Sequence, residues 1–232
     1  MHPYEISVLD ESYLLFSLPY GGNESDYARV GERCVFLVPS VNADFRITGL
    51  GKGGKPLYDY YSATVCAAAY LTVKCGLPLT EISFETPNGN LEILCTGSGS
   101  FSVKMNECKL LFSNHIEICG FVPDVAEVET GGIFRVASVP SDAKFSEALA
   151  PRLAGAAFPL PQAVILSTLR DNELSIKAYA DYNPTPPSTL LCYAAAAYKE
   201  GRGTARLSLG NGALATVGFS SVEITLKPIF SA

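Results

Sequence analysis

The chain has 232 residues, 48% of them hydrophobic and 17% charged, with a formal net charge of −6. These values describe an ordinary globular protein, and the lack of a basic cluster argues against a nucleic-acid partner. No run of about 18 uncharged apolar residues occurs, so we expect no membrane span and no membrane partner. The seven cysteines are spaced irregularly, and the start of the chain lacks the basic and apolar segments of a signal peptide. We therefore expect reduced thiols and a cytoplasmic location.

Short apolar runs in the first quarter of the chain predict β-strands. Residues 4–18 lead into a Pro/Gly turn, and residues 34–38 and 43–48 are rich in β-branched and aromatic side chains. The glycine-rich residues 49–55 carry two lysines and could be read as a phosphate loop. They lack the Gly-Lys-Ser/Thr end that feeds a helix, so a plain hairpin turn is the favoured interpretation.

Two later stretches, residues 62–93 and 188–217, share one order of features. Each has a serine suited to cap a helix, an alanine-rich helical run, a glycine that ends it, and two strand-like runs around Asn-Gly. The matching residues are Ser62 and Ser188, Cys66 and Cys192, Gly76 and Gly201, and Gly89 and Gly212. Such a shared order is hard to obtain by chance, so we infer an internal duplication. Both helical runs are apolar on every face, and we expect each to be buried.

The second half of the chain reads mainly as strands. These are expected at residues 116–122, 133–139, 164–166, 174–178 and 222–226, with a hairpin about residues 171–172. A helical pattern covers residues 142–154, with Pro151 as its stop. Asn114-His115 reads as a loop, which places the domain boundary there. We expect an N-terminal domain of residues 1–115 and a C-terminal domain of residues 116–232, with a final strand able to pack on the first domain.

The order of residues resembles the diaminopimelate epimerase superfamily over most of the chain. The segments that carry this likeness are Gly-Glu-Arg-Cys-Val-Phe-Leu-Val-Pro at 31–39, Ala-Asp-Phe-Arg-Ile at 43–47, Cys-Ala-Ala-Ala-Tyr at 66–70, Pro-Asn-Gly-Asn-Leu at 87–91, and in the second half residues 158–164, 174–179 and the helix at Cys192. The resemblance implies an α+β protein of two pseudo-symmetric domains, each an antiparallel sheet rolled around a central buried helix, with a cleft between them. It also implies racemisation, epimerisation or isomerisation of a small carboxylic acid without a cofactor.

The epimerase itself uses two opposed cysteines, because inversion at carbon needs a proton removed on one face and delivered on the other. In that family each cysteine precedes a central helix, whose N-terminus lowers the thiol pKa and holds the substrate carboxylate. By resemblance these cysteines fall on Tyr60 and Pro187, so both are lost. The family's Glu-Arg pair falls on Ala178-Tyr179, and its Asn-Pro-His segment falls near residues 133–135. The chain therefore resembles the scaffold of the epimerase without its catalytic site.

Candidates to replace the two lost cysteines lie near the starts of the same two helical runs. Tyr60 is either a general acid or a side chain that fills the cleft. Asp59 and Asp181 are either general bases or solvated loop charges. The resemblance places the substrate carboxylate on the first turns of the two helices. The residues it assigns to substrate binding are Tyr61, Ser62, Ala63, Ser188 and Thr189.

Cysteine and histidine side chains offer a second set of candidates. Cys66 and Cys192 are either a displaced thiol dyad or small core residues of buried helices, and the second interpretation is favoured. His2 and His115 read as a residue of the N-terminal segment and a residue of a loop. Neither a Cys-x-x-Cys pair nor a histidine pair is available for a metal, so we expect no metal and no cofactor.

Two functions of different classes remain open. The first is a cofactor-independent isomerase, or related lyase, of a small carboxylic acid with a non-cysteine acid/base. The second is a catalytically inactive epimerase relic that binds a ligand or a partner protein. An isomerase needs a base of perturbed pKa facing helix N-termini, whereas a relic can have its cleft filled by aromatic side chains. The expected partner is a small-molecule carboxylate, and the chain could form a homodimer.

Overall fold

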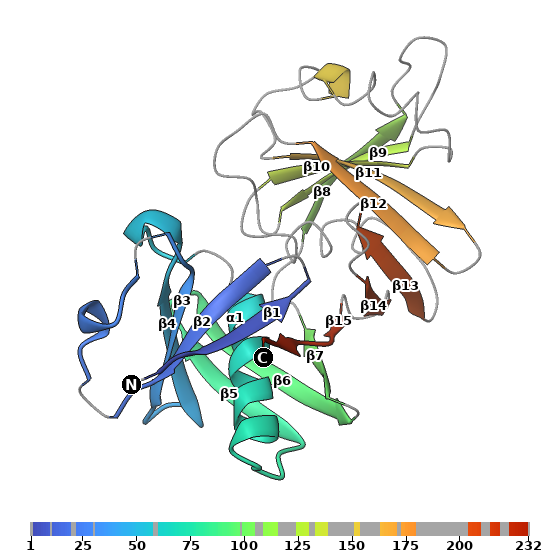
Figure 1. The fold of residues 1–232 in the computed structure, drawn as a ribbon. Coiled ribbons are helices and arrows are strands. Elements are labelled where there is room, and N and C mark those ends of the chain that lie inside the picture. Colours follow the sequence, from blue (N-terminus) through green and yellow to red (C-terminus); the bar gives the residue numbers. More distant parts are fainter. Residues whose placement is uncertain are drawn as a thin grey trace. The chain divides into compact units, whose positions relative to one another are not determined.

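The computed structural model describes most of the first hundred residues and a set of strands beyond them (Figure 1). The described residues are 2–9, 11–19, 22–29, 31–57, 60–97, 99–104, 109–115, 124–129, 133–138, 151–153, 163–170, 173–179, 204–209, 214–218 and 223–231. The chain divides into two compact units. Unit 1 is formed by Met1–Lys104 with Thr225–Ala232, and unit 2 by Met105–Ile224.

The division between the units falls earlier in the chain than the sequence suggested. Asn114 and His115 are not a loop but the end of strand β8 (Lys109–His115), which pairs antiparallel with β9 (Asp124–Glu129). That pairing ties β8 to unit 2, so the boundary lies after Lys104 rather than after residue 115. At the other end of the chain, β16 (Ile229–Phe230) pairs with β1 (Tyr4–Val8), which returns the C-terminal segment to unit 1.

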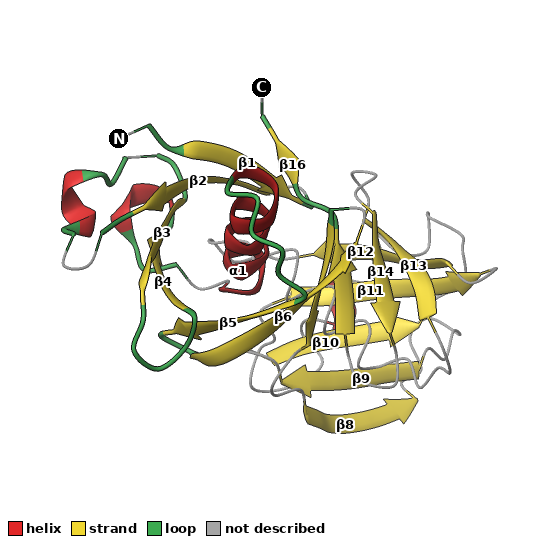
Figure 2. Ribbon diagram, turned by 90° about the horizontal axis from the view of Figure 1, so that it is seen from below, coloured by secondary structure: helices red, strands yellow, loops and turns green. Residues whose placement is uncertain are grey.

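Unit 1 is a curled sheet around one helix, with β1 to β6 surrounding α1 in Figure 2. Its strands follow the order β16-β1-β2-β3-β4-β5-β6-β7-β15. Besides β1 and β16 they are β2 (Glu11–Ser17), β3 (Cys34–Pro39), β4 (Phe45–Leu50), β5 (Glu81–Thr86), β6 (Gly89–Gly97), β7 (Ser100–Lys104) and β15 (Glu223–Leu226). The helical elements are η1 (Glu24–Asp26), η2 (Lys52–Gly54), α1 (Tyr60–Ala69) and a π-helical turn η3 (Tyr70–Lys74). The helix contacts β1, β2, β4, β5, β6 and β7.

Helix α1 is buried because the sequence gives it no polar face. Every residue of α1 is buried apart from Tyr61. The side chains of Ala67, Ala68 and Ala69 end at a single methyl group, so the surrounding strands can approach the helix closely. Thr64 is fully buried as well, and its hydroxyl donates to the carbonyl of Tyr61 at 2.8 Å. The prediction of a central buried helix is therefore confirmed for unit 1.

The two faces of the sheet in unit 1 have different coverings. Cys34, Phe36 and Val38 point to one face of β3, where they cluster with Phe16 and Leu18 of β2 and its end. The segment that carries η1 covers this cluster, because the Tyr27 ring lies 5.7 Å from the Phe16 ring. Successive strand residues point to opposite faces. The intervening residues of β2 and β3 therefore face the other way.

Helix α1 faces that other side of the sheet. The ring of Tyr4 lies 4.9 Å from the ring of Tyr70, which continues the helix, so Tyr4, Ile6 and Val8 share the helix face of β1. Ile6 pairs directly with Tyr13 across the antiparallel ladder, and directly opposed residues point to the same face. Tyr13 and its alternating neighbours on β2 consequently face the helix.

The two ends of the helical segment differ in how well the sequence predicted them. Gly76 follows the π-helical turn with φ of +68°, as expected for a glycine that ends a helix. Ser62 does not cap the helix, because α1 already begins at Tyr60 and Ser62 is fully buried in its first turn. Packing of the first turn outweighs the local preference of serine for a capping position.

Two of the turns predicted in unit 1, at residues 88–89 and 49–55, are present, the first of them with a shifted register. Thr86 pairs with Gly89, so the loop between β5 and β6 is Pro87-Asn88 and not Asn88-Gly89. Proline suits the second position of such a turn, and Gly89 follows it with φ of +110°. The glycine-rich residues 49–55 close as a turn, since the N–H of Gly51 donates to the carbonyl of Lys55 at 2.7 Å.

Unit 2 is described mainly through its strands. Besides β8 and β9 they are β10 (Ile133–Ser138), β11 (Ala163–Arg170), β12 (Glu173–Tyr179), β13 (Thr204–Leu209) and β14 (Leu214–Gly218). The hairpins predicted about residues 171–172 and 211–212 are confirmed by the antiparallel pairs β11·β12 and β13·β14. Residues 151–153 are helical and include Pro151, so the described part of the pattern predicted at 142–154 is a helix. The predicted helix at 189–197, the predicted strand at 116–122 and residues 142–150 lie outside the described residues.

One order of strand pairings occurs in both units. From β16 to β6 the pairings run antiparallel, antiparallel, parallel, antiparallel, parallel, antiparallel. From β8 to β14 the same order returns. Each sheet is thus mixed rather than antiparallel as predicted, because some neighbouring strands are joined by crossovers, of which α1 between β4 and β5 is one. The repeated order of pairings supports the inferred duplication.

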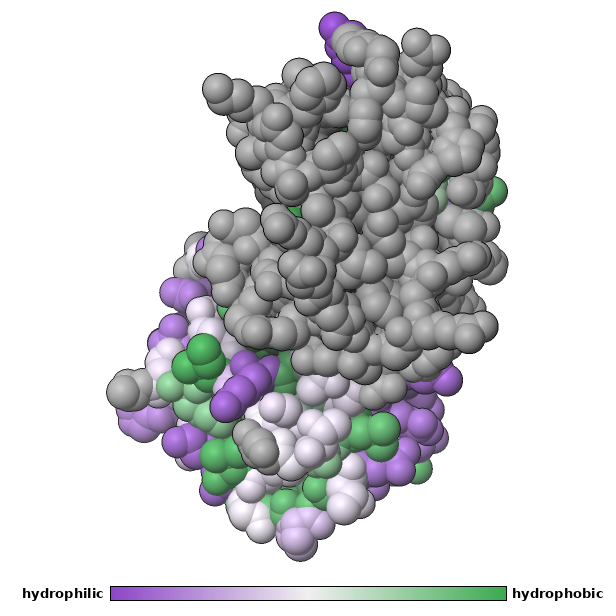
Figure 3. Space-filling view, turned by 90° about the vertical axis from the view of Figure 1, so that its right-hand side faces the viewer, coloured by the Kyte–Doolittle hydropathy of each residue, from purple (hydrophilic) through white to green (hydrophobic). Residues whose placement is uncertain are grey.

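The described surface of unit 1 is mixed in character. On the face drawn in Figure 3, small apolar patches alternate with hydrophilic residues. Within the described ranges, no helix reaches the length and apolarity that crossing a bilayer requires.

Candidate functional site

The start of α1 lies at a definite end of unit 1. Strands β3 and β4 are antiparallel, so β3 begins where β4 ends. The N–H of Leu57 donates to the carbonyl of Gly49 at 3.2 Å, and a Cβ atom on Gly49 would lie 2.7 Å from the carbonyl oxygen of Cys34. This close packing brings the segment before α1 next to the beginning of β3. Tyr4 and Tyr70 mark the opposite end of the helix.

Tyr60, a candidate general acid or cleft-filling side chain, is the first residue of α1 and is only 5% exposed. Burial raises the pKa of the Tyr60 phenol above its ordinary value, and the negative charge of Glu24 raises this pKa further. Such a phenol stays protonated at neutral pH. It can donate a proton or a hydrogen bond, but it cannot serve as a general base.

Glu24 is a residue that the sequence interpretation missed. It lies in η1, and its carboxylate accepts a hydrogen bond from the Thr48 hydroxyl of β4. Its charge acts on Tyr60, whose pKa it raises. In the sequence Glu24 stands among Asn23, Ser25 and Asp26, which is the pattern of an ordinary solvated loop. No local signal in the chain distinguishes it from those neighbours.

The other predicted ligands of unit 1 lie in the first turn of α1. Ser62 and Ala63 are fully buried and Tyr61 is half-buried. A helix N-terminus offers backbone N–H groups and the positive end of its dipole to an anion. Ser62 and Ala63 are 0% exposed as whole residues, so their backbone N–H groups are buried together with their side chains.

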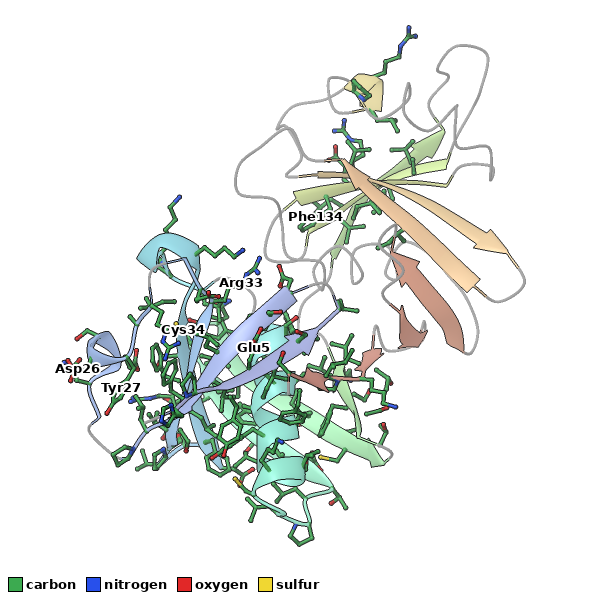
Figure 4. The ribbon with its side chains drawn as sticks, in the orientation of Figure 1. Glu5, Asp26, Tyr27, Arg33, Cys34 and Phe134 are labelled. Carbon is green, nitrogen blue, oxygen red and sulfur yellow. The ribbon has the colours of Figure 1, made fainter. Side chains whose placement is uncertain are left out.

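A buried polar cluster lies at the same end of unit 1 and was also missed. Glu11 accepts a hydrogen bond from the Tyr13 hydroxyl at 2.6 Å and an ion pair from Arg33 Nη2 at 2.9 Å. The guanidinium carbon of Arg33 lies 5.9 Å from the centre of the Tyr13 ring. Glu11 is 8% exposed, Tyr13 is 1% exposed, and the Arg33 side chain is 28% exposed. In Figure 4, Arg33 lies at the end of unit 1 that carries η2.

The position of this cluster follows from the fold. Glu11 and Tyr13 share the face of β2 that carries Leu15, which is the helix face of the sheet. Arg33 directly precedes Cys34 of β3, next to the segment that leads into α1. The sequence signal for Glu11 and Tyr13 is an acidic and an aromatic residue two positions apart on one face of a strand. Arg33 comes from a distant part of the chain, so its partnership with Glu11 had no such signal.

The thiols do not form a reactive pair in the described part of the chain. Cys34 and Cys66 are buried, Cys75 is exposed and Cys95 is half-buried, and all of them are free thiols. Cys66 lies 3.9 Å from the carbonyl oxygen of Ile6, to which its S–H donates weakly. This supports the interpretation of Cys66 as a core residue. Among the described residues, no group of three or more His, Cys, Asp or Glu side chains is arranged to hold a metal.

Several predicted site residues lie outside the described residues. They are Asp59, Asp181, Ser188, Thr189 and Cys192. Of the predicted site, the structure therefore brings together Tyr60, Tyr61, Ser62 and Ala63 at the start of α1. Glu24 and the cluster of Glu11, Tyr13 and Arg33 lie at the same end of unit 1 and had not been predicted.

Comparison with known proteins identifies relatives by fold. No protein-family model and no curated protein matches the sequence. Among solved structures, a phenazine biosynthesis protein of the PhzF family from Enterococcus faecalis aligns with a TM-score of 0.66 at 11% identity, covering 99% of this chain and 97% of that one. A hydroxyproline epimerase from Agrobacterium vitis with bound trans-4-hydroxy-L-proline aligns with a TM-score of 0.61 at 12% identity, covering 99% of this chain and 90% of that one.

A third structure extends the same likeness. Methylitaconate-delta-isomerase aligns with a TM-score of 0.52 at 10% identity, covering 100% of this chain and 94% of that one. All three structures belong to one fold superfamily, although their names describe different activities. At these identities the likeness concerns the fold, and each alignment spans both units. The chain therefore has the two-domain α+β fold of the diaminopimelate epimerase-like superfamily.

Proposed function

We propose that the chain is a cofactor-independent isomerase of a small carboxylic acid, with Tyr60 as its general acid. The observation that carries this proposal is the burial of Tyr60 at the first residue of the central helix, with a raised phenol pKa. Perturbed titratable groups gather at functional sites more often than elsewhere. The proposal is also supported by the fold, since an epimerase and an isomerase are among the similar structures.

The reaction needs one proton removed from carbon and one returned, so its atoms balance without an electron carrier. The protonated phenol of Tyr60 would deliver a proton. Its raised pKa keeps that proton available at neutral pH. The substrate carboxylate would bind at the start of α1, where the positive end of the helix dipole lies. Asp59 and Asp181 are the proposed bases, because a carboxylate is ionised at the pH at which the phenol is not.

Deuterium exchange tests the proposal directly. We would incubate the full chain in heavy water with a panel of carboxylic acids whose C–H bonds are activated by a neighbouring double bond or carbonyl group. Enzyme-dependent deuterium uptake is expected for at least one acid. Removing a general acid typically lowers a rate by about 10²–10⁴-fold, so Tyr60→Phe should reduce uptake by about that factor. Asp59→Asn and Asp181→Asn identify the base.

A matched tyrosine provides the control. Tyr27 is half-buried against Phe16 on the opposite face of the sheet, so Tyr27→Phe should leave uptake unchanged. We expect no epimerisation of diaminopimelate, because neither cysteine of that reaction is present at the matching positions. Failure of uptake across the panel, together with binding of the same acids, would favour the non-catalytic ligand-binding protein instead.

A further inference from the structure

We propose that residues 22–29 form a strap that opens from the outer face of the unit 1 sheet and carries the Glu24 carboxylate away from Tyr60. The outer face is the face of the sheet opposite α1, and the strap contains η1. The opening itself does not depend on any substrate. Its effect on Tyr60 rests on the proposed function and adds a means of controlling the same site.

The strap lies on an apolar surface that the sheet would otherwise present to solvent. Five side chains of this surface are between 0% and 5% exposed, namely Phe16, Leu18, Cys34, Phe36 and Val38. Among the described strap residues, Tyr27 packs against them, and its ring lies 5.7 Å from the ring of Phe16. Figure 4 labels Tyr27 on the strap and Cys34 on β3. Closure of the strap therefore buries apolar surface, which favours the closed state.

A side-chain hydrogen bond complements this apolar contact. The Thr48 hydroxyl of β4 donates to the Glu24 carboxylate. Thr48 shares the outer face with the apolar surface, because it directly opposes Phe36 across the antiparallel pair β3·β4. Within the described ranges, this bond and the ring contact of Tyr27 with Phe16 are the hydrogen-bond and ring contacts that join the strap to the sheet.

The backbone of the described strap residues is bonded locally and not to a strand. The N–H of Asp26 donates to the carbonyl of Asn23 at 3.3 Å, and the N–H of Tyr27 donates to the carbonyl of Glu24 at 3.1 Å. The exposed strap residues are Asn23, Ser25, Asp26, Ala28 and Arg29. Segments with few buried contacts and exposed backbone hydrogen bonds open locally at low cost. The strap is therefore able to open without the loss of any strand pairing.

Glu24 connects the strap to the candidate site. Burial raises the pKa of the Tyr60 phenol, and the Glu24 charge in the closed strap raises it further. The same negative charge opposes an anionic ligand beside Tyr60. Such a coupling is reciprocal, so an anionic ligand favours the open strap as much as opening favours the ligand. The closed strap is thus an autoinhibitory contact.

Timed thiol labelling of the full chain without a ligand measures the opening. Cys34 reports on the strap, because it is fully buried in the apolar surface beneath it. Cys66 is fully buried in α1 and reports on opening of unit 1 as a whole. Cys34 should react faster than Cys66. Thr48→Val should raise the Cys34 rate about tenfold and leave the Cys66 rate unchanged, because a hydrogen bond to a charged group contributes roughly this much.

Tyr27 provides the second variant. Tyr27→Ala removes the ring that packs on Phe16 and should also accelerate the labelling of Cys34 alone. Tyr27→Phe keeps the ring, so it should leave both labelling rates unchanged. Equal acceleration of Cys34 and Cys66 in the Thr48→Val and Tyr27→Ala variants, or no acceleration of Cys34 in either variant, overturns the strap.

Ser83 supplies the matched control. Its hydroxyl donates to the Asp44 carboxylate at 2.7 Å, so Ser83→Ala removes a hydroxyl–carboxylate bond from the same sheet without touching the strap. The Cys34 labelling rate should stay at its wild-type value in this variant. A rise as large as that in Thr48→Val would mean that Cys34 reports on general loosening of the sheet, and the strap would be rejected.

The coupling to Tyr60 is tested by labelling in the presence of an acid that exchanges deuterium, at constant ionic strength. The acid should raise the Cys34 rate severalfold, and Glu24→Gln should abolish this increase because it removes the charge that opposes the ligand. If the acid leaves the Cys34 rate unchanged or lowers it, the coupling is wrong while the proposed function stands. If no acid exchanges deuterium, the proposed function and the coupling fail together, and labelling without a ligand still decides whether the strap opens.

Discussion

Each unit contains an Arg–Glu ion pair, and the two pairs differ in what surrounds the arginine. In unit 2, Arg135 of β10 pairs with Glu127, which lies directly opposite on β9, and it also donates to the carbonyl of Leu153. The Arg135 side chain is 2% exposed, against 28% for Arg33 in unit 1. The same residue types thus form two kinds of pair. We call Arg135–Glu127 the closed pair, because its arginine is shielded from solvent, and Arg33–Glu11 the open pair, because its arginine is partly exposed.

The difference indicates which arginine is accessible to solvent. Arg135 donates hydrogen bonds to Glu127 of the sheet and to the carbonyl of Leu153 in the turn of residues 151–153. It therefore connects two parts of unit 2. Arg33 is fixed from behind by Glu11 and Tyr13 and stays accessible in front. A buried charge costs several kcal/mol when its partner is removed, whereas a partly exposed charge is compensated by water. The contrast therefore makes predictions of very different size.

The largest effect is expected in unit 2. Arg135→Ala leaves Glu127 without its opposed cation and removes the donor to Leu153. We expect a loss of about 3–5 kcal/mol in the free energy of unfolding. Chemical denaturation measures it, with Arg46→Ala as an exposed control expected to change stability by less than about 0.5 kcal/mol. A loss in Arg135→Ala as small as that of the control would show that the closed pair does not support the fold.

Thiol labelling extends the contrast between closed and open sites to the cysteines. Cys66 is fully buried in α1, and Cys75 is exposed at the end of the helical segment. A buried thiol reacts only after local opening, which costs several kcal/mol for a core helix. Cys66 should therefore react on the order of 100-fold more slowly than Cys75, since every 1.4 kcal/mol is tenfold. Mass spectrometry of peptides after timed labelling measures both rates, and equal rates would contradict the burial of α1.

A smaller effect is expected when the open pair is broken. Arg33→Ala should lower the free energy of unfolding by about 1 kcal/mol, because water can reach part of the site that the guanidinium leaves. The same denaturation experiment compares it with Arg135→Ala. If the two substitutions have equal costs, the distinction between a closed and an open pair does not hold, and Arg33 becomes a structural residue like Arg135.

The smallest effect concerns the titration of Tyr60. Burial and the charge of Glu24 raise the pKa of its phenol in the folded protein. The unfolded chain therefore loses this proton first, so the contribution of Tyr60 to stability is complete below about pH 10 and is lost as the pH rises beyond it. Tyr60→Phe should make the decline in stability above that pH less steep. Glu24→Gln should lower the Tyr60 pKa, which the ultraviolet absorbance of tyrosinate measures.

Tyr70 is the control for that titration. Its pKa is also raised, chiefly by burial, and it lies at the opposite end of the helical segment. Glu24→Gln should leave the Tyr70 titration where it is. A shift of both tyrosines by the same amount would mean that Glu24 acts on the stability of unit 1 as a whole rather than on Tyr60.

Local patterns in the sequence predicted the features that depend on neighbouring residues. The all-apolar run after Tyr60 predicted a buried helix, Gly76 predicted its end, and the Asn-Gly of residues 88–89 predicted a hairpin. The hairpin register was shifted because Pro87 takes the second position of the turn. Short-range preferences therefore gave correct elements with boundaries displaced by a residue or two.

Features that depend on distant residues could not be read in this way. The parallel pairing of β2 with β3 joins strands that are separated by the segment carrying η1, so the predicted antiparallel sheets proved mixed. The boundary after residue 115 was wrong for the same reason, since β8 finds its partner in β9. In the candidate site, Tyr60 was selected by its place before the helix. Arg33 and Glu11 were missed because their contact joins residues far apart in the chain.

The central claim is that a small carboxylate binds at the start of α1, beside Tyr60. Its most direct test is an NMR titration of the full chain carrying ring-labelled tyrosine, with an acid that exchanges deuterium as ligand and resonances assigned by single Tyr→Phe variants. The Tyr60 signal should shift with one saturable affinity that Arg46→Gln leaves unchanged. Saturable shifts confined to Tyr4 and Tyr70, at the other end of the helical segment, or no saturable shift of any tyrosine, would contradict the claim.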